Sequence, residues 1–154
     1  MAYIINKSAR TIDGVKCIFE RPKLLDSDFS EKINRFTDNF ADSFEKSISD
    51  VWSEHECRRI FFRVSCREYL NFFSLHFSVD IEKYNSESVC FYRSFVFDIQ
   101  TGLIVKLSDI AEKVFASEHK KWSFYIGDNK IVAYRLNGQG AVAETAVGKL
   151  LAHE

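Results

Sequence analysis

The residues with the clearest chemical potential are the four histidines, and His76 has the most suggestive neighbours. Ser74, Ser78 and Asp80 lie on the same alternate positions as His76, and the positions between them are apolar. Alternate residues of a strand share one face, so a serine, a histidine and a carboxylate could meet there as in a small hydrolase. A general base needs a partner within hydrogen-bond reach, and the spacing indicates none for any histidine. We therefore expect no catalytic residue, and the face of His76 is either a binding surface or an ordinary solvated face.

Two further clusters contain ligand-type residues. Glu54-His55-Glu56-Cys57 offers four metal-ligating groups in a row, but adjacent side chains point in different directions and a metal site needs convergence. The other cysteines, Cys17, Cys66 and Cys90, show no C-x-x-C and no paired histidine spacing. Gly138-Gln139-Gly140 lacks the third glycine and the following helix of a dinucleotide-binding loop. The sequence predicts no metal and no cofactor, and it favours free buried thiols over disulfides.

The remaining candidates would bind rather than react. Tyr92 is expected on a strand beside that of His76, and Tyr84 lies where the connection between the two strands begins. An exposed sheet face, or the loop from Tyr84 to Tyr92, could recognise a ligand. The predicted binding residues are His76, Asp80, Tyr84, Tyr92 and Arg93.

The longest periodic segment predicts a helix that would position these strands. Between Asp28 and Trp52, apolar residues recur at steps of three or four, the period of one helix face, and the opposite face is charged. Asp28 followed by Glu31 is typical of an N-cap with a partner three residues on. We expect a long amphipathic helix whose apolar face packs on a sheet.

After this helix the period changes to two, which predicts half-buried strands at 59–66, 72–81 and 89–99. Their short polar connections favour an antiparallel meander, because parallel pairs need crossovers of about a dozen residues. The expected fold class is α+β: a long amphipathic helix packed on an antiparallel meander sheet, with a second short helix and a C-terminal hairpin. The other expected elements are a hairpin of 3–6 with 14–21, a strand at 103–107, a helix at 108–117, a hairpin of 122–126 with 131–136, and an edge strand at 145–151.

Composition limits the function. The 154 residues read as a single domain over 1–154, with 21 basic and 22 acidic residues, so nucleic acid is not an expected partner. Arg59, Arg63 and Arg67 could form a short exposed stripe on one strand face. No stretch has the roughly 20 apolar residues that span a bilayer, so we expect no membrane insertion. Residues 1–10 lack the apolar core of a signal peptide, which favours the cytoplasm if the chain begins at Met1.

The run FVFDIQTGLIVKLSDI at 95–110 resembles the D-x-x-T-G-x-x-x-x-L-S-D signature of the RsiV/PdaC-like bacterial domain of unknown function. The segment PKLLDSDFSEKINRFTDNF, at 22–40, is similar to the family's proline-bearing strand and following helix. Residues 122–128 and 130–134 look like its Phe-Tyr strand, turn and next strand. The resemblance covers about residues 14–136. The chain departs from the family at 86–92, where a Gly-Gly-Ala-His segment is missing, and at 136–142, which lacks a proline.

The resemblance implies an extracytoplasmic location and a role in recognition. One such relative is an anti-sigma factor whose domain binds lysozyme, and another is the accessory domain of a peptidoglycan deacetylase. A non-catalytic binding or sensing domain of the cell envelope is therefore expected, with a protein or a peptidoglycan-type glycan as its ligand. The alternative is a cytoplasmic interaction domain or homodimer, for which the missing signal peptide and the scattered cysteines are the grounds.

Overall fold

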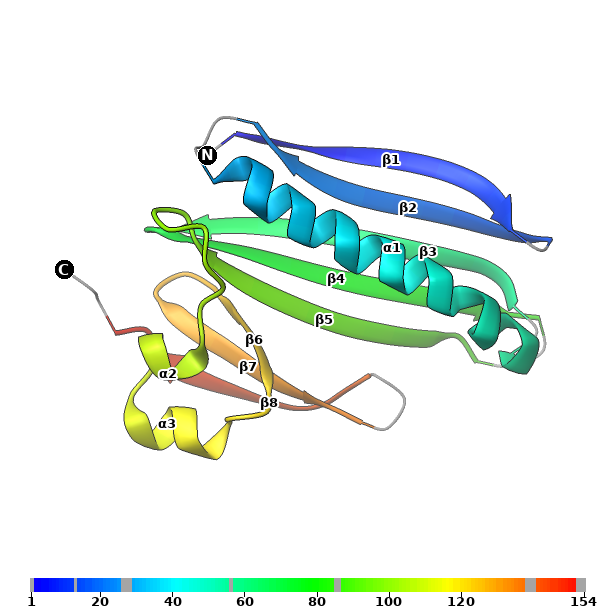
Figure 1. The fold of residues 1–154 in the computed structure, drawn as a ribbon. Coiled ribbons are helices and arrows are strands. Elements are labelled where there is room, and N and C mark those ends of the chain that lie inside the picture. Colours follow the sequence, from blue (N-terminus) through cyan, green and yellow to red (C-terminus); the bar gives the residue numbers. More distant parts are fainter. Residues whose placement is uncertain are drawn as a thin grey trace. The chain divides into compact units, whose positions relative to one another are not determined.

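The protein was analysed as a computed structural model that describes residues 2–12, 14–25, 29–55, 57–84, 87–137 and 141–151, with the backbone alone over 47–55. Figure 1 labels the elements. In chain order they are β1 Tyr3–Ile12, β2 Val15–Leu24, α1 Ser30–His55, β3 Cys57–Tyr69, β4 Phe72–Lys83, β5 Val89–Asp98, α2 Leu107–Ile110, α3 Lys113–Glu118, β6 Ser123–Ile126, β7 Lys130–Leu136 and β8 Val142–Lys149.

The strands form two sheets. The first has the order β1-β2-β3-β4-β5, and the second has the order β6-β7-β8. β1 and β2 are antiparallel, but β2 and β3 are parallel, with Lys16–Phe19 opposite Arg59–Phe62. The chain between β2 and β3 contains α1, which is the long crossover that a parallel pair requires. The first sheet is therefore mixed.

The predicted fold class is wrong. The described chain is mostly β and has two sheets. The expected fold was a long helix on one antiparallel meander sheet, with a second short helix and a C-terminal hairpin. Two pairings account for the difference. The N-terminal hairpin joins the main sheet through the parallel β2–β3 pair, and the C-terminal hairpin gains β8 and becomes a sheet of its own. The helix predicted over 28–52 is found at Ser30–His55, and its predicted N-cap, Asp28, lies outside the described residues.

By its contacts the chain divides into two compact units. The N-terminal unit contains Met1–Val64 and Ser78–Phe91, and the C-terminal unit contains Ser65–Phe77 and Tyr92–Glu154. β3, β4 and β5 each contribute residues to both units. The region around His76 therefore belongs to the C-terminal unit, together with β6, β7 and β8.

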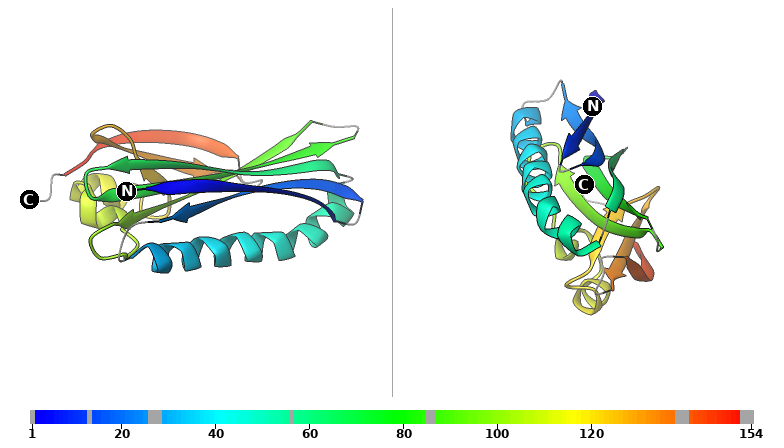
Figure 2. Two further views of the ribbon diagram at one scale, coloured as in Figure 1. Left: turned by 90° about the horizontal axis from the view of Figure 1, so that it is seen from above. Right: turned by 90° about the vertical axis from the view of Figure 1, so that its right-hand side faces the viewer.

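The N-terminal unit packs α1 on its strands, as Figure 2 shows. Phe62 of β3 is 1% exposed, and its ring centroid lies 5.1 Å from that of Phe44 and 6.4 Å from that of Phe40, both on α1. The start of the helix is fixed to β2 by Asn34, whose side chain accepts from the Leu24 amide at 2.8 Å and donates to the Leu24 carbonyl at 3.0 Å. Aromatic packing and this paired hydrogen bond place the helix.

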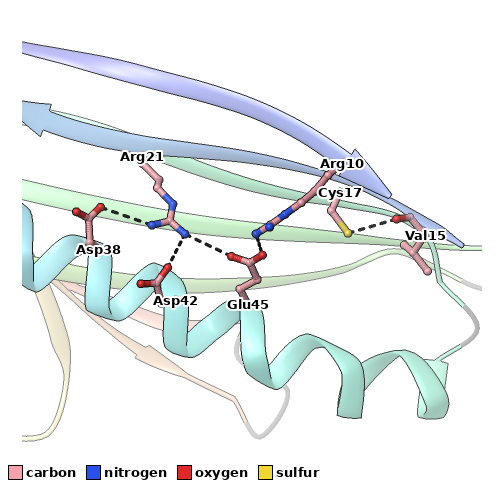
Figure 3. Close-up of polar contacts among 7 residues, drawn as sticks. All are labelled: Arg10, Val15, Cys17, Arg21, Asp38, Asp42 and Glu45. Carbon is pink, nitrogen blue, oxygen red and sulfur yellow. Dashed lines mark hydrogen bonds and ion pairs between the residues drawn. The ribbon is translucent and has the colours of Figure 1, made fainter. Parts of the chain in front are cut away.

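The charged face of α1 also contacts the strands (Figure 3). Arg21 of β2 lies 2.7 Å from a carboxylate oxygen of Asp42 and 3.3 Å from one of Glu45, and it also approaches Asp38. Arg10 of β1 pairs with Glu45 as well. The charged face of the helix therefore pairs with two arginines of the N-terminal hairpin.

The C-terminal unit has its own apolar core, built from β4, β5, α2, α3 and the second sheet. Ile110, Ile126 and Ile131 are at most 1% exposed within it. Phe115 of α3 packs against this core so closely that a Cβ added at Gly148 of β8 would lie 2.7–2.9 Å from its ring. Among the described residues, no helix is long and apolar enough to cross a membrane.

Candidate functional site

A chain of three hydrogen-bonding side chains links the strands of the C-terminal unit. Nδ1 of His76, on β4, lies 2.5 Å from Oγ of Ser94 on β5. The same Oγ lies 2.6 Å from the hydroxyl of Tyr134 on β7. Ser94 is 8% exposed and Tyr134 is 3% exposed, so these polar groups satisfy one another away from solvent. The chain can run in either direction, because each hydroxyl can donate or accept.

Aromatic rings surround the imidazole of His76. Tyr92 of β5 stacks on it with a centroid distance of 5.7 Å, and Tyr125 of β6 is tilted against it at 5.5 Å. The ring of Tyr134 meets it edge-on at 5.9 Å. His76, Tyr92 and Tyr125 are each half-buried, and we call these three residues the His76 surface.

Strand periodicity explains why these groups meet. Tyr92 and Ser94 share one face of β5, as Ser74 and His76 share one face of β4. On the second sheet, Ser123 of β6 is the register partner of Tyr134, so the two share a face, and Tyr134 also hydrogen-bonds the Ser123 side chain. Within the C-terminal unit, polar positions of two sheets therefore face each other.

Burial sets the electrostatics of the cluster. It lowers the pKa of His76 below its ordinary value of 6.5, because the charged imidazolium loses hydration there. It raises the pKa of Tyr134 above 10.0, although the hydrogen bonds from Ser94 and Ser123 oppose that shift. Both groups are therefore neutral near pH 7. A neutral histidine whose Nδ1 contacts Ser94 can accept a hydrogen bond from a ligand, or donate one to it, through Nε2.

Ser74 and Asp80, the possible hydrolase partners of His76 in the sequence, contact other residues in the structure. Ser74 is 3% exposed, and its hydroxyl oxygen accepts a hydrogen bond from the Ile126 amide at 3.1 Å. Asp80 belongs to the N-terminal unit and forms an ion pair with Arg63 at 3.9 Å. The serine that contacts His76 is Ser94. The alternative that the face of His76 is an ordinary solvated face is wrong at Ser74, because β6 covers this side chain.

The other predicted binding residues have separate surroundings. Tyr84 directly follows β4, belongs to the N-terminal unit and is 64% exposed. Arg93 lies over the ring of Phe95 at 5.2 Å. Residues 93 and 95 point to the face of β5 away from Tyr92, so Arg93 is outside the His76 surface. Of the five predicted residues, His76 and Tyr92 are brought together.

Sequence reasoning missed Tyr125 and Tyr134. Both lie in segments whose strand character was predicted, and each follows an apolar residue of its strand, Phe124 or Ala133. A buried tyrosine usually finds a partner for its hydroxyl, so a tyrosine in a buried strand was a usable signal. The identity of that partner depends on how the second sheet packs.

The predicted arginine stripe is largely neutralised. Arg59 forms two hydrogen bonds with the Glu82 carboxylate, at 2.8 and 3.2 Å, and this carboxylate raises the pKa of Arg59. Arg63 pairs with Asp80 and lies over the Phe61 ring. Two of the three arginines of the stripe, Arg59 and Arg63, are therefore matched by carboxylates.

The other ligand-type clusters can be placed only in part. Side chains of 54–56 and the whole of 138–140 lie outside the described residues. The part of the chain that the structure describes contains no group of three His, Cys, Asp or Glu side chains able to hold a metal ion. Cys17, Cys57 and Cys66 form no disulfide, and burial raises the pKa of Cys17 to about 11 and that of Cys66 to about 12. Such thiols are poor nucleophiles at neutral pH.

The D-x-x-T-G and L-S-D residues form turns and caps. The Asp98 carboxylate accepts from the Gln100 amide at 2.8 Å, and Gly102, at φ 71°, donates its amide to the Asp98 carbonyl at 2.7 Å. The Asp109 carboxylate accepts from the Lys106 amide at 3.1 Å, ahead of α2. These residues shape the connection from β5 to α2.

Comparison with known proteins shows the fold. No family model and no curated protein matches the sequence. A DUF3298 family protein from Pseudomonas aeruginosa PAO1 is similar in structure, with a TM-score of 0.65 and 8% identity over 97% of this chain and 90% of that one. A DUF3298 member from Bacteroides fragilis NCTC 9343 has a TM-score of 0.49 and 11% identity over 96% and 88%. The chain thus has a fold found in a bacterial domain of unknown function.

Proposed function

We propose that this chain is a non-catalytic recognition domain of the bacterial cell envelope, of the RsiV/PdaC-like kind. The His76 surface would bind a protein or a peptidoglycan-type glycan. The observation that carries the proposal is the half-buried set of His76, Tyr92 and Tyr125 rings, held from behind by Ser94 and Tyr134. The sequence resemblance to RsiV/PdaC-like domains supports the envelope setting, and the DUF3298 fold is one that occurs in bacteria.

The geometry of the cluster suits recognition. Tyrosine rings give a large contact area and lose little conformational entropy on binding, which is why they are enriched in binding surfaces. Here the stacked His76 ring restricts Tyr92 further. The neutral imidazole adds a polar group without the desolvation cost of a charge.

The same geometry does not favour a hydrolase. Ser94 is 8% exposed and its hydroxyl contacts both His76 and Tyr134, so a substrate carbonyl would have little access to that hydroxyl. A nucleophile also needs its base oriented by a third group. Within the described part of the chain, the His76 ring hydrogen-bonds Ser94, and its other contacts are with the rings of Tyr92, Tyr125 and Tyr134.

Replacing Tyr92 with alanine should weaken binding of the recognised ligand about five- to thirtyfold, as expected for an aromatic residue central to an interface. Isothermal titration calorimetry with hen lysozyme, and separately with soluble muropeptides, measures this effect. Tyr84→Ala is the matched control, because it removes a tyrosine that is 64% exposed in the other unit. The proposal fails if neither ligand binds the wild type. If Tyr84→Ala weakens binding as much as Tyr92→Ala does, the ligand does not bind at the His76 surface as proposed.

One observation favours a second candidate function, self-association. β1 is an edge strand of the first sheet, and Tyr3 through Thr11 are all exposed. Three of its large apolar side chains, Tyr3, Ile4 and Ile5, are 38–44% exposed. A long exposed strand edge of this kind is a template for pairing with another chain, including a second copy.

If this edge forms a homodimer, Ile4→Lys should shift the chain to monomer in sedimentation equilibrium, because a charged edge resists pairing. Val114→Lys is the matched control, since Val114 is an apolar residue that is 69% exposed in the C-terminal unit. A wild type that is monomeric at all concentrations tested would exclude this candidate.

A further inference from the structure

A groove of about 610 Å³ in the C-terminal unit is lined by residues outside the His76 surface. Its volume lies within the roughly 300–1,000 Å³ that is usual for small-molecule sites. α3 supplies one wall with Lys113, Ala116 and Ser117, which share a helix face because they are three and four residues apart. Lys120, after α3, and Lys106, directly before α2, also line the groove.

The floor of the groove is aromatic. Trp122 and Phe124 line it, and both are half-buried. The Trp122 ring is held edge-on by His119 at a centroid distance of 4.5 Å, and His119 in turn packs on Phe115 at 4.3 Å. Phe124 packs against the core of the unit. The floor is therefore fixed in place before any ligand arrives, which lowers the entropic cost of binding.

The rim of the groove is positively charged. Lys106, Lys113 and Lys120 are all exposed, and within the described part of the chain none of them forms an ion pair. The described residues that line the groove include no aspartate or glutamate. Ser108 and Ser117 add hydroxyl groups. By contrast, Arg21 and Arg59 in the N-terminal unit are both matched by carboxylates.

We propose that this groove binds a small amphipathic anion, a molecule with a flat apolar ring and a carboxylate or similar anionic group. The ring would lie against Trp122 and Phe124, and the anion would be held by the lysine ammonium groups. This site is separate from the His76 surface. Phe124 and Tyr125 are adjacent on β6, so their side chains point to opposite faces of that strand.

Three probes separate the two parts of this chemistry: 2-naphthoate has the ring and the charge, 2-naphthalenemethanol has the ring alone, and acetate has the charge alone. Calorimetry and ¹⁵N NMR on the full chain should show that 2-naphthoate binds about tenfold or more tighter than either of the others. Binding of 2-naphthoate should shift the protein's NMR signals at Trp122 and in α3. Raising salt from about 20 to 200 mM should weaken its binding, because exposed charges are screened.

Lysine substitutions test the rim. Lys113→Gln and Lys120→Gln should each weaken 2-naphthoate binding about two- to fivefold, and the double variant should weaken it more. Lys121→Gln is the matched control, because Lys121 is exposed and adjacent in sequence but does not line the groove. Two results would overturn the proposal: equal affinity for the naphthoate and its neutral alcohol, or equal losses in Lys120→Gln and Lys121→Gln.

Discussion

Replacing Tyr134 with alanine is expected to lower the free energy of unfolding by about 3–5 kcal/mol, the usual cost of truncating a buried aromatic residue. Tyr134 is 3% exposed, and its ring packs edge-on against His76. Its hydroxyl lies 2.6 Å from Ser94. The alanine variant loses the ring and its hydrogen bonds and leaves a cavity beside the His76 surface.

A phenylalanine at the same position separates these two losses. Tyr134→Phe keeps the ring and removes the hydroxyl, so it should cost about 1 kcal/mol. Urea denaturation measures both variants, and Tyr84→Ala, at an exposed tyrosine, should change stability by less than about 0.5 kcal/mol. Equal costs for the phenylalanine and alanine variants would mean that the ring packing described here contributes nothing.

The second large effect is a pH dependence of stability that comes from His76. Burial lowers its pKa below 6.5 in the folded chain, so the unfolded chain takes up this proton at a higher pH than the folded chain does. The unfolded state therefore binds more protons as the pH falls below 6.5, and the free energy of unfolding decreases there. The slope for one such group is at most about 1.4 kcal/mol per pH unit. Well above pH 6.5, His76 is neutral in both states and its titration no longer lowers the free energy of unfolding.

Urea denaturation of the wild type and of His76→Gln at several pH values between about 5 and 8 measures this slope. The wild type should lose more stability than the variant over the acidic part of the range. The remaining residues are common to both chains, so their contributions cancel in the comparison. Parallel curves for the two chains would show that His76 titrates alike in the folded and unfolded states.

Local periodicity was enough to place the central strands. Phe73, Leu75 and Phe77 alternate with polar residues, and the strand they predict is β4. Periodicity gives a strand's faces but not its neighbours, so it could not show that β2 pairs with β3 in parallel. That pairing depends on the packing of α1, through contacts such as that of Phe44 with Phe62.

Proline was a misleading signal for the end of β2. The strand was expected to stop before Pro22, yet β2 continues to Leu24. Pro22 lies opposite Ile5 of β1, whereas the β2–β3 pairing covers Lys16–Phe19. Pro22 therefore lies beyond the part of β2 that pairs with β3, and a strand tolerates the missing amide of proline at such a position.

The candidate site was predictable only in part, for a related reason. His76 and Tyr92 were identified because they lie on polar faces of neighbouring strands. Small hydroxyl residues such as Ser74 and Ser94 suit a solvated face and a buried, hydrogen-bonded face equally well. The strands that bury them begin at Ser123, far along the chain, so local sequence could not distinguish the two.

An NMR titration of the His76 imidazole tests the central claim most directly, namely that this residue is a neutral member of a recognition surface and not a general base. Its carbon-bound ring protons report the pKa, and nitrogen shifts report whether Nδ1 is hydrogen-bonded as the contact with Ser94 requires. The account predicts that the pKa of His76 is below 6.5 in the folded chain. It should rise toward 6.5 when the chain is unfolded and Ser94 and Tyr134 no longer bury the ring. A pKa near or above 7, the range of an efficient general base, would contradict it.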